Sequence, residues 1–372
     1  MRILEVSTNF HPGGIQRHVL DLTTYLRARG HTVVLAGDEG AWGGTGTDPE
    51  FVRVPLDAVA GTGGSGLRRL SRLPGCAALL RREIRRRAID LVHAHETAPA
   101  LAARLATLGL GVPVVMTFHG SEPSRVASVA RIGRLCADRV VSPSRLSLDA
   151  LIAHGLPADR ARQLGLGVAA FPARDAGEIA DLRRALLGGR AGPLIVSLSR
   201  LDRQKGLDVM VEAMRRLIVA HPGATCVVAG GGPLEGSVKG WATEAGVAEA
   251  MRFVGPVTGV DRYLRAADIY LLTSRWEALP ISIVEAFRAG LPVVATDCGG
   301  VSELVDDSVG ALVPVGDVAA IAAALDRLAG DAALRQAKGA AALARSGEAR
   351  FDPDAVHAGF ERFYAETLEA RR

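Results

Sequence analysis

Two successive series of short apolar segments constrain this chain more than any other feature. The first series contains RILEVS, TVVLAG, DLVHAH, PVVMTF and DRVVSPS, separated by longer amphipathic stretches. The series restarts after residue 190 with PLIVSLS, ATCVVAGGG, MRFVGPV, DIYLLTS, PVVATD and GALVPV. Short β-branched runs of this kind are typical of buried parallel strands that helices connect. The sequence therefore predicts an α/β protein with two doubly wound domains rather than one large sheet.

The domain division follows from chain length and from the point where the pattern weakens. The 372 residues are too many for one ordinary domain and enough for two complete cores. We expect a linker over residues 171–192, a Rossmann-like N-terminal domain over 1–172 and a Rossmann-like C-terminal domain over 191–354. A helix over 355–372 could pack on either domain, including back on the N-terminal one. Ligands of such folds bind outside the carboxyl ends of the strands, so the active site is expected in a deep cleft between the facing domains.

Composition and charge exclude several classes of protein. The chain is 48% hydrophobic and 23% charged, which is typical of a globular protein. Its net charge of +4 permits a phosphate-bearing ligand or transient contact with an anionic membrane, and it is too small to indicate a partner nucleic acid. The four cysteines are scattered without C-x-x-C spacing, so we expect neither a zinc site nor a disulfide framework.

Neither of the two most apolar stretches predicts a targeting or membrane-spanning segment. The N-terminal run MRILEVS is too short for a signal peptide and is expected to be a strand. Residues 99–118 are apolar but are interrupted by Arg104, Gly109, Gly111 and Pro113, which favours a helix followed by a buried strand. A cytoplasmic protein is expected.

The segment SRWEALPISIVEA, residues 274–286, carries two carboxylates, Glu277 and Glu285. Eight helical steps of about 100° would leave two side chains roughly 80° apart, so a continuous helix would not direct both at one atom. Pro280 suits the start of a helix and is poor inside one. We therefore expect Glu277 on a loop, a helix starting near Pro280 and Glu285 one to two turns inside it. The start of a helix can bind a phosphate, and an acid on either side could bind hydroxyl groups, as a nucleotide sugar requires.

Three further segments could contact a diphosphate. Gly13 and Gly14 follow the first strand and precede a helix, where backbone N–H groups can approach an anion. Arg200 and Lys205 follow the first strand of the second series and suit two phosphate groups. The glycines of GGGP, residues 230–233, end another strand. Taken singly, these patterns also fit tight turns and solvated surface cations.

Together and in this order, the motifs resemble one family of enzymes. They are GGIQRH, HAH at 93–95, TFHG at 117–120, VSPS at 141–144, SRLDRQKG at 199–206, the Glu277–Glu285 pair and DCGGVSELV at 297–305. The chain resembles the retaining glycosyltransferases of family four, which include the glycosyl transferases group 1 and have the GT-B fold. The resemblance covers essentially the whole chain.

The resemblance implies a role for each matching position. Arg200 and Lys205 would neutralise the leaving diphosphate, Glu277 would bind the ring hydroxyls of the donor sugar, and Glu285 would bind the ribose hydroxyls of the nucleotide. His119 would lie near the donor sugar, whereas His93 and His95 are expected to be structural. The implied catalytic residues are His119, Glu277, Arg200 and Lys205. The implied donor-binding residues are Gly14, Arg200, Lys205, Gly232, Val254, Leu279, Pro280, Ile281 and Glu285.

The expected reaction moves a hexose-type sugar from a nucleotide-sugar donor to a glycan, lipid-linked or small-molecule acceptor. The sequence EALPISI resembles that of UDP-sugar users. Because Arg200 and Lys205 would hold the diphosphate, no metal and no cofactor is expected. Ala278-Leu279-Pro280 replaces the commoner glycine–aromatic–glycine sequence, a change that bears on the choice of donor sugar.

Other functions stay open at this point. One alternative is a mannosyltransferase that uses GDP-mannose, and another is a nucleotide-sugar epimerase or hydrolase of the same fold. A degenerate regulatory module is disfavoured because the four charged positions are intact. A nicotinamide dehydrogenase is disfavoured because no G-x-G-x-x-G follows the first strand.

An arginine-rich stretch, LLRREIRRR at 79–87, bears on the acceptor. It places Arg81, Arg82, Arg85 and Arg86 on one side of a predicted helix, and Arg68, Arg69 and Arg72 lie just upstream. The stretch fits a solvated cationic face. It also fits a surface that attracts anionic lipid, since each basic residue contributes about 1 kcal/mol there. The second interpretation predicts a peripheral enzyme at the inner face of a membrane.

Overall fold

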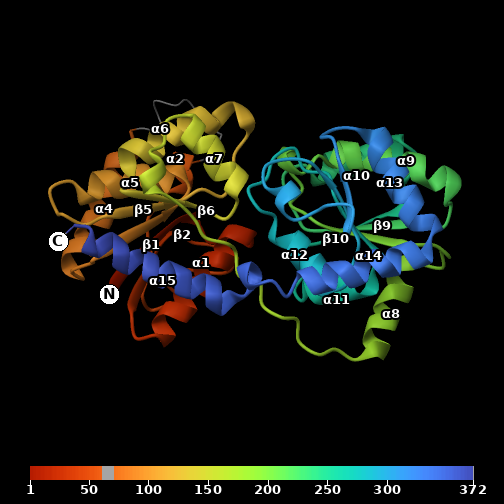
Figure 1. Cartoon of the computed structure of the whole chain (residues 1–372), viewed down its shortest axis with the longest axis horizontal. Helices are drawn as coiled ribbons and strands as arrows, with labels where there is room; N and C mark the ends of the chain where they lie inside the picture. Colours follow the sequence, from red (N-terminus) through yellow and green to blue (C-terminus); the bar gives the residue numbers. More distant parts are fainter. Residues whose placement is uncertain (61–70, 372) are drawn as a thin grey trace. The chain divides into compact units, whose positions relative to one another are not determined.

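The computed structural model describes residues 1–60 and 71–371, which form two compact units. Unit 1 comprises Met1–Gly167 together with Asp352–Arg372, and unit 2 comprises Val168–Phe351. Each unit contains one parallel sheet flanked by helices (Figure 1). No helix among the described residues is both long enough and apolar enough to cross a bilayer. The arginines at 68 and 69 lie outside the described residues.

The sheet of unit 1 has seven parallel strands in the order β3-β2-β1-β4-β5-β6-β7. The strands are β1 (Arg2–Asn9), β2 (Thr32–Asp38), β3 (Phe51–Arg53), β4 (Leu91–His95), β5 (Val114–Thr117), β6 (Arg139–Ser142) and β7 (Ala161–Gln163). The helices are α1 (Gly14–Ala28), α2 (Asp57–Ala60), α4 (Leu73–Arg86), α5 (Thr97–Thr107), α6 (Val126–Cys136), α7 (Arg145–Ala153) and α15 (Pro353–Glu369).

Alternate residues of each central strand of unit 1 enter different cores. Leu4 of β1 packs in a cluster with residues of α4 and α5, whereas Ile3 packs with residues of α1 and α15. This separation follows from the two-residue period of strand side chains. On the face of the sheet that α1 and α15 cover, apolar side chains occupy the amino-terminal part of the strands, with Leu91 of β4 beside Ile3. Two residues further along the same strands lie the polar pair Glu5 and His93.

Unit 2 repeats the architecture with six parallel strands in the order β10-β9-β8-β11-β12-β13, the order of a dinucleotide-binding fold. The strands are β8 (Leu194–Leu198), β9 (Thr225–Ala229), β10 (Met251–Gly255), β11 (Ile269–Leu272), β12 (Val293–Thr296) and β13 (Gly310–Val313). The helices are α8 (Ala176–Leu187), α9 (Leu207–Ala220), α10 (Glu235–Glu244), α11 (Val260–Ala266), α12 (Ile281–Arg288), α13 (Val318–Gly330) and α14 (Ala332–Arg345). Two buried clusters, one on each face, complete this unit.

The predicted fold class is confirmed, and the details differ at the boundary. Residues 171–192 do not form a linker but contain α8, which Arg183 fastens to unit 2 through Asp268 (2.7 Å) and the Ala266 carbonyl (2.6 Å). Unit 2 therefore already begins at Val168. The first and last residues of this unit are hydrogen-bonded, because Val168 N–H donates to the carbonyl of Phe351 (3.0 Å). The C-terminal helix, α15, belongs to unit 1. The short edge strands β3 and β7 have no counterpart in the sequence prediction, because three residues are too few to show a period.

Candidate active site

Lys205 and Glu277 form an ion pair in unit 2, although 71 residues separate them. The distance from Lys205 Nζ to Glu277 Oε1 is 2.5 Å, and the two side chains are 14% and 9% exposed. The same carboxylate oxygen accepts a hydrogen bond from the Ser274 hydroxyl (2.7 Å), and its second oxygen accepts one from Gln204 Nε2 (3.4 Å). A lysine, a carboxylate and two hydrogen-bonding side chains thus meet where the chain leaves β8 and β11.

Two glycines hold the backbone around Glu277. Gly206 follows Lys205 with a φ of +59°, and a Cβ there would overlap the carbonyl oxygen of Thr273. Gly299 has a φ of +55°, and its Cβ would overlap the carbonyl oxygen of Glu277 itself. Both positions need glycine because the conformation is left-handed and the backbone on the other side is close. The two segments that carry Lys205 and Glu277 are therefore fixed by backbone packing as well as by their ion pair.

The segment after Glu277 has the predicted form. Glu277 lies outside regular structure, Pro280 is the residue that caps the start of α12, and Glu285 lies half-buried inside that helix. The first N–H groups of α12 have no helical acceptor and carry the positive end of the helix dipole. The region consequently offers a carboxylate, a helix N-terminus and a second carboxylate in succession.

Arg200 lies at the same end of β8 but in a different environment from Lys205. Its side chain is 62% exposed and contacts Asp202 Oδ2 (3.1 Å) and Gln204 Oε1 (3.3 Å). Gln204 also donates to the carbonyl of Trp276 (2.8 Å), so it connects the Arg200 loop to the Glu277 loop. Arg200 therefore approaches the Lys205–Glu277 pair through Gln204.

The other expected donor-binding residues of unit 2 are arranged around the same sheet edge. Gly232 lies against the backbone of Leu201, whose carbonyl a Cβ at 232 would overlap. Val254, Leu279 and Ile281 are partly buried and pack against the core. These positions offer backbone groups and apolar surface rather than charge.

The two expected residues of unit 1 lie at the corresponding end of its sheet. Gly14 is the first residue of α1 and is exposed. His119 follows β5, is partly exposed, and lies 3.1 Å from His95 through its Nε2 atom. Burial and the neighbouring His95 hold the pKa of His119 well below its usual value, so its ring is neutral near pH 7.

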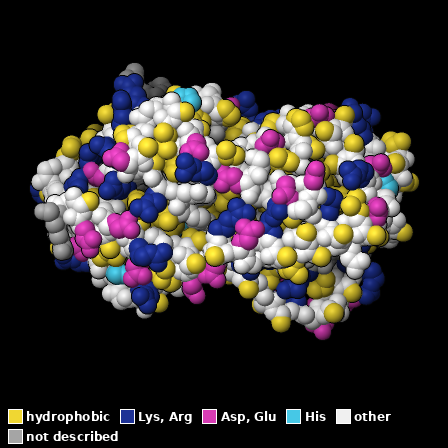
Figure 2. All heavy atoms as spheres, in the orientation of Figure 1, with side chains coloured by type: hydrophobic (Ala, Val, Ile, Leu, Met, Phe, Trp, Pro, Cys, Tyr) yellow, Lys and Arg dark blue, Asp and Glu magenta, His cyan; other side chains and the backbone are white. Residues whose placement is uncertain are grey.

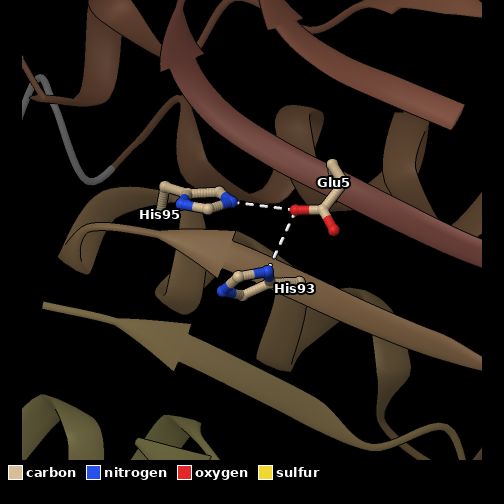
Figure 3. A group of neighbouring side chains, drawn as sticks. All are labelled: Glu5, His93 and His95. Carbon is tan, nitrogen blue, oxygen red and sulfur yellow. Dashed lines mark hydrogen bonds and ion pairs between the residues drawn. The ribbon is translucent and has the colours of Figure 1, made fainter. Parts of the chain in front are cut away.

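Next to His119, a buried acid lies between two histidines (Figure 3). Glu5 Oε2 lies 2.8 Å from His95 Nε2 and 3.0 Å from His93 Nδ1, and all three side chains are fully buried. Burial alone would raise the pKa of the Glu5 carboxyl, but the two rings outweigh it and lower the pKa. Burial lowers the pKa of His95 to about 4. The expected structural placement of His93 and His95 agrees with this burial.

These three residues also have the residue types of a metal site, with ligand atoms within 4.8 Å of one another. Each of those atoms already has a protein partner, because His93 Nδ1 also contacts the Tyr364 hydroxyl (2.6 Å), which donates to Glu5 Oε1 (3.1 Å). Metal-bound diphosphates can also be held by paired aspartates, and the sequence has one D-x-D pattern, at 352–354. The Asp352 carboxylate of that pattern caps α15 by accepting a hydrogen bond from Ala355 N–H (2.8 Å).

Sequence reasoning missed three residues of these arrangements. Ser274 and Gln204 belong to motifs that were recognised, SRWEALP and SRLDRQKG. The Gln204 hydrogen bond to Glu277 depends on two loops meeting, whereas Ser274 contacts Glu277 from three residues earlier in the same loop. Glu5 gave a clearer signal, because it is an acid inside an otherwise uncharged strand segment, ILEVSTN. A charge in such a position is rarely buried without a partner.

Known proteins show the same fold and sequence pattern. Residues 12–169 match the family described as Glycosyltransferase Family 4, and residues 180–345 match Glycosyl transferases group 1. A phosphatidyl-myo-inositol mannosyltransferase of Mycobacterium leprae is 31% identical over 90% of this chain and 89% of its own length. A glycogen synthase of Mycobacterium tuberculosis is 30% identical over 93% of this chain and 90% of its own length.

Solved structures agree on the architecture. Anabaena Alr3699/HepE, in complex with UDP and glucose, gives a TM-score of 0.81 at 21% identity over 98% of this chain and 99% of its own. Sucrose-phosphate synthase from Thermosynechococcus elongatus gives 0.82 at 20% identity over the full length of both. Two Rossmann-like domains in one chain, with these relatives, define a glycosyltransferase of the GT-B fold. The chain belongs to glycosyltransferase family 4, the glycosyl transferases group 1.

Proposed function

We propose that this enzyme transfers a hexose-type sugar from a nucleoside-diphosphate sugar, preferably a UDP-sugar, to a glycan, lipid-linked or small-molecule acceptor with retention of configuration. The observation that carries the proposal is the Lys205–Glu277 pair beside the N-terminus of α12. Lys205 can neutralise a phosphate, and Glu277 can accept hydrogen bonds from sugar hydroxyls. A nucleotide sugar presents both groups side by side.

The other residues complete the binding of the donor. Arg200 shares the diphosphate with Lys205, and Glu285 accepts hydrogen bonds from the ribose hydroxyls. Backbone groups at Gly232 and at residues 279–281, with the side chain of Val254, line the nucleotide. Gly14 and His119 contribute from unit 1, His119 to the donor sugar.

The proposed transfer balances in a single step and needs no nucleophile from the enzyme. The bond from the sugar C1 to the diphosphate oxygen breaks, and its electron pair leaves with the diphosphate. The acceptor hydroxyl forms the new bond to C1 on the same face, and its proton passes to the departing phosphate oxygen. Lys205 and Arg200 stabilise the negative charge that grows on the diphosphate, so the reaction needs no metal.

Relatives support two choices of nucleotide. The structure of Anabaena Alr3699/HepE with UDP-glucose favours a UDP-sugar, whereas the mannosyltransferase of Mycobacterium leprae favours transfer of mannose, for which our alternative donor is GDP-mannose. A thermal-stability screen with UDP and GDP distinguishes them, because a ligand that binds only the folded protein stabilises it by about 2.7 kcal/mol at 100 times its Kd. We expect UDP to raise the melting temperature of the wild type and to have little effect on Lys205→Ala.

The outcomes of that screen separate the alternatives. Stabilisation by GDP alone would replace the UDP proposal with the mannosyltransferase one, and no stabilisation by either would contradict the nucleotide site. Incubation with donor in the presence and absence of acceptors then distinguishes transfer from epimerisation or hydrolysis. An axial or equatorial anomeric proton in the product, read by NMR, tests retention.

The membrane proposal concerns the exposed arginines of α4. Arg81 does not belong to this set, because it donates to the carbonyls of Ala106 (2.9 Å) and Leu108 (2.7 Å) at the end of α5. Arg82, Arg85 and Arg86 are exposed, and Arg82 and Arg86 contact the buried carboxylate of Glu83. On the face that Figure 2 shows, Lys and Arg side chains are interspersed with Asp and Glu.

We propose that Arg82, Arg85 and Arg86 attract anionic lipid and bring the enzyme to a lipid-linked acceptor. Co-sedimentation with anionic vesicles at low salt should be lost in an Arg82/Arg85/Arg86→Ser variant and retained in an Arg215/Arg216/Lys239→Ser control, which removes the same charge from unit 2. A wild-type protein that stays in the supernatant would favour a soluble acceptor.

A further inference from the structure

A chain of hydrogen bonds runs from the buried carboxylate of Glu5 through His95 to His119. The distances are 2.8 Å from Glu5 Oε2 to His95 Nε2 and 3.1 Å from His95 Nδ1 to His119 Nε2. The rings of His95 and His119 are nearly parallel, with an interplanar angle of 22° and 5.4 Å between their centroids, so the two nitrogens face each other edge to edge. Three elements supply the chain: β1, β4 and the loop after β5.

The direction of each hydrogen bond follows from the chemistry of the first group. An ionised carboxylate can only accept, so His95 Nε2 must carry the proton that it shares with Glu5. The low pKa of His95 leaves its ring neutral near pH 7, so Nδ1 carries a lone pair. That lone pair can contact His119 Nε2 favourably only if His119 Nε2 carries a proton.

His119 is therefore left with one defined nitrogen for other partners. Because its ring is also neutral, a proton on Nε2 leaves a lone pair on Nδ1. No protein partner of Nδ1 is found among residues 1–60 and 71–371. The neighbouring His18 ring lies edge-on to His119, with 5.9 Å between the ring centroids, and both of its nitrogens are buried without a partner among the same residues. A ring held in this tautomer can accept a hydrogen bond from a hydroxyl group and cannot donate one through Nδ1.

We propose that Glu5 and His95 are positioning residues that fix His119 as the Nε2–H tautomer, so that its Nδ1 accepts a hydrogen bond from a hydroxyl of the donor sugar. The part about the sugar rests on the proposed function, whereas the tautomer depends only on the geometry of unit 1. A buried acid that fixes the tautomer of a catalytic histidine is the arrangement of the Ser-His-Asp triads, where replacing the acid by its amide lowers kcat by about 10⁴.

The metal interpretation of the same cluster predicts the opposite tautomer. A cation bound by Glu5 and by His95 Nε2 would require an unprotonated Nε2, and the proton of His95 would then be on Nδ1. His95 Nδ1 would donate to His119 Nε2, and His119 would carry its own proton on Nδ1. One measurement on His119 therefore distinguishes a proton chain from a metal site.

The test is long-range proton–nitrogen NMR of the full-length protein labelled with ¹⁵N-histidine at pH 7. The His119 signals are assigned by their absence from a His119→Asn variant. We expect the shift pattern of a protonated Nε2 and an unprotonated Nδ1 in the wild type. A protonated Nδ1, with or without bound zinc, would overturn the proposal.

Two variants of the same buried site separate positioning from stability. Glu5→Gln keeps the size of the side chain but replaces an obligatory acceptor with a group that can also donate, so we expect a mixture of His119 tautomers. Tyr364→Phe removes the hydrogen bond to the other carboxylate oxygen, Oε1, together with the contact to His93 Nδ1, but it leaves the Glu5–His95–His119 chain intact and should leave the His119 tautomer unchanged. A mixture in Tyr364→Phe, or an unchanged Nε2–H tautomer in a folded Glu5→Gln, would contradict the chain.

Enzyme kinetics provide a second, independent test. Glu5→Gln should lower kcat/KM for the donor on the order of tenfold to a hundredfold, because a reactive group that loses its orientation costs that much. Tyr364→Phe should retain most of its turnover. A wild type with the expected tautomer and no transfer of any sugar would reject the proposed function and leave the positioning chain standing. If Glu5→Gln does not fold, the wild-type spectrum still decides the tautomer.

Discussion

The two units have the same strand order around their first strand, yet they place a glutamate in opposite chemical environments. Glu277 of unit 2 lies at a loop with Lys205, where the pair is nearly buried but lies among residues that remain accessible, such as Arg200. Glu5 of unit 1 lies inside the sheet, under α1 and α15, and its partners are histidines and Tyr364. The Lys205–Glu277 pair thus borders accessible residues, whereas the Glu5 carboxylate is completely enclosed by the protein.

The two environments of Glu277 and Glu5 suit different chemical roles within the same fold. A lysine paired with a glutamate can exchange part of its interaction for a phosphate, since ammonium and phosphate attract without strict geometry. A carboxylate that contacts a neutral imidazole, as Glu5 contacts His95, instead fixes the proton positions, since each nitrogen of a neutral ring can only donate or only accept. Our proposals accordingly assign the charged donor to unit 2 and the ring held in one tautomer to unit 1.

The largest expected effect is on Lys205. Lys205→Ala should lower turnover on the order of a hundred- to a thousandfold, because removing one preorganised contact to a transition-state charge costs about 2.7 to 4 kcal/mol. Steady-state kinetics with the donor identified in the stability screen measures it. Lys239→Ala, which removes a lysine paired with Glu235 on the surface of α10, is the matched control. Near-normal turnover of Lys205→Ala would break the assignment of unit 2 to the diphosphate.

Arg200→Ala should have a smaller effect on the same reaction. The guanidinium is 62% exposed and already contacts Asp202, so its contact with a diphosphate is more solvated than that of Lys205. A hydrogen bond to a charged group contributes about 1.5 to 3 kcal/mol, which corresponds to roughly a tenfold to hundredfold loss of kcat/KM. A loss larger than that of Lys205→Ala would reverse the order of the two cations.

Acid should destabilise unit 1 more than unit 2. Burial lowers the pKa of His18, His95, His119 and His357 below the usual value. Around them lie Glu5, His93 and Tyr364, and Asp21, Asp352 and Asp354 act on His357. Below about pH 6.5 these histidines are protonated in the unfolded chain but remain neutral in the folded chain.

The sign of the effect is therefore fixed. Stability that these histidines contribute is complete above about pH 6.5 and is lost as the pH falls towards about 4, the pKa of His95. Each proton changes the free energy of unfolding by about 1.4 kcal/mol per pH unit. Hydrogen exchange at pH 7 and pH 5 should show β1 and β4 losing protection before β8 and β11. Equal loss in both units would remove the histidines as the cause.

The smallest effect is expected from metal removal. Treatment with a chelator should leave turnover within about twofold, because Lys205 and Arg200 supply the positive charge that a metal would supply. Loss of activity that magnesium or manganese restores would contradict the metal-free proposal. Loss that only zinc restores would direct attention to the Glu5, His93 and His95 cluster instead.

Local sequence was enough to predict the elements that carry the candidate site in unit 2. Pro280 and the helical angle between Glu277 and Glu285 predicted that α12 starts near Pro280, with one acid before that start and one inside the helix. The strands of both sheets followed from β-branched runs, apart from the three-residue edges β3 and β7. These features depend on neighbours along the chain, where propensity and periodicity act directly.

The sequence by itself therefore determined the fold class, the family and the position of the charged motifs along the chain. Only the tertiary structure decided that Lys205 contacts Glu277, that α15 returns to unit 1, and that Glu5 meets His95 and Tyr364. Parallel strands that are neighbours in space lie far apart in sequence, so the side chains that they bring together share no local pattern. Proton positions are even harder to predict from sequence. In our proposal the tautomer of His119 depends on the Glu5 carboxylate, which is two hydrogen bonds away in space but more than a hundred residues away along the polypeptide.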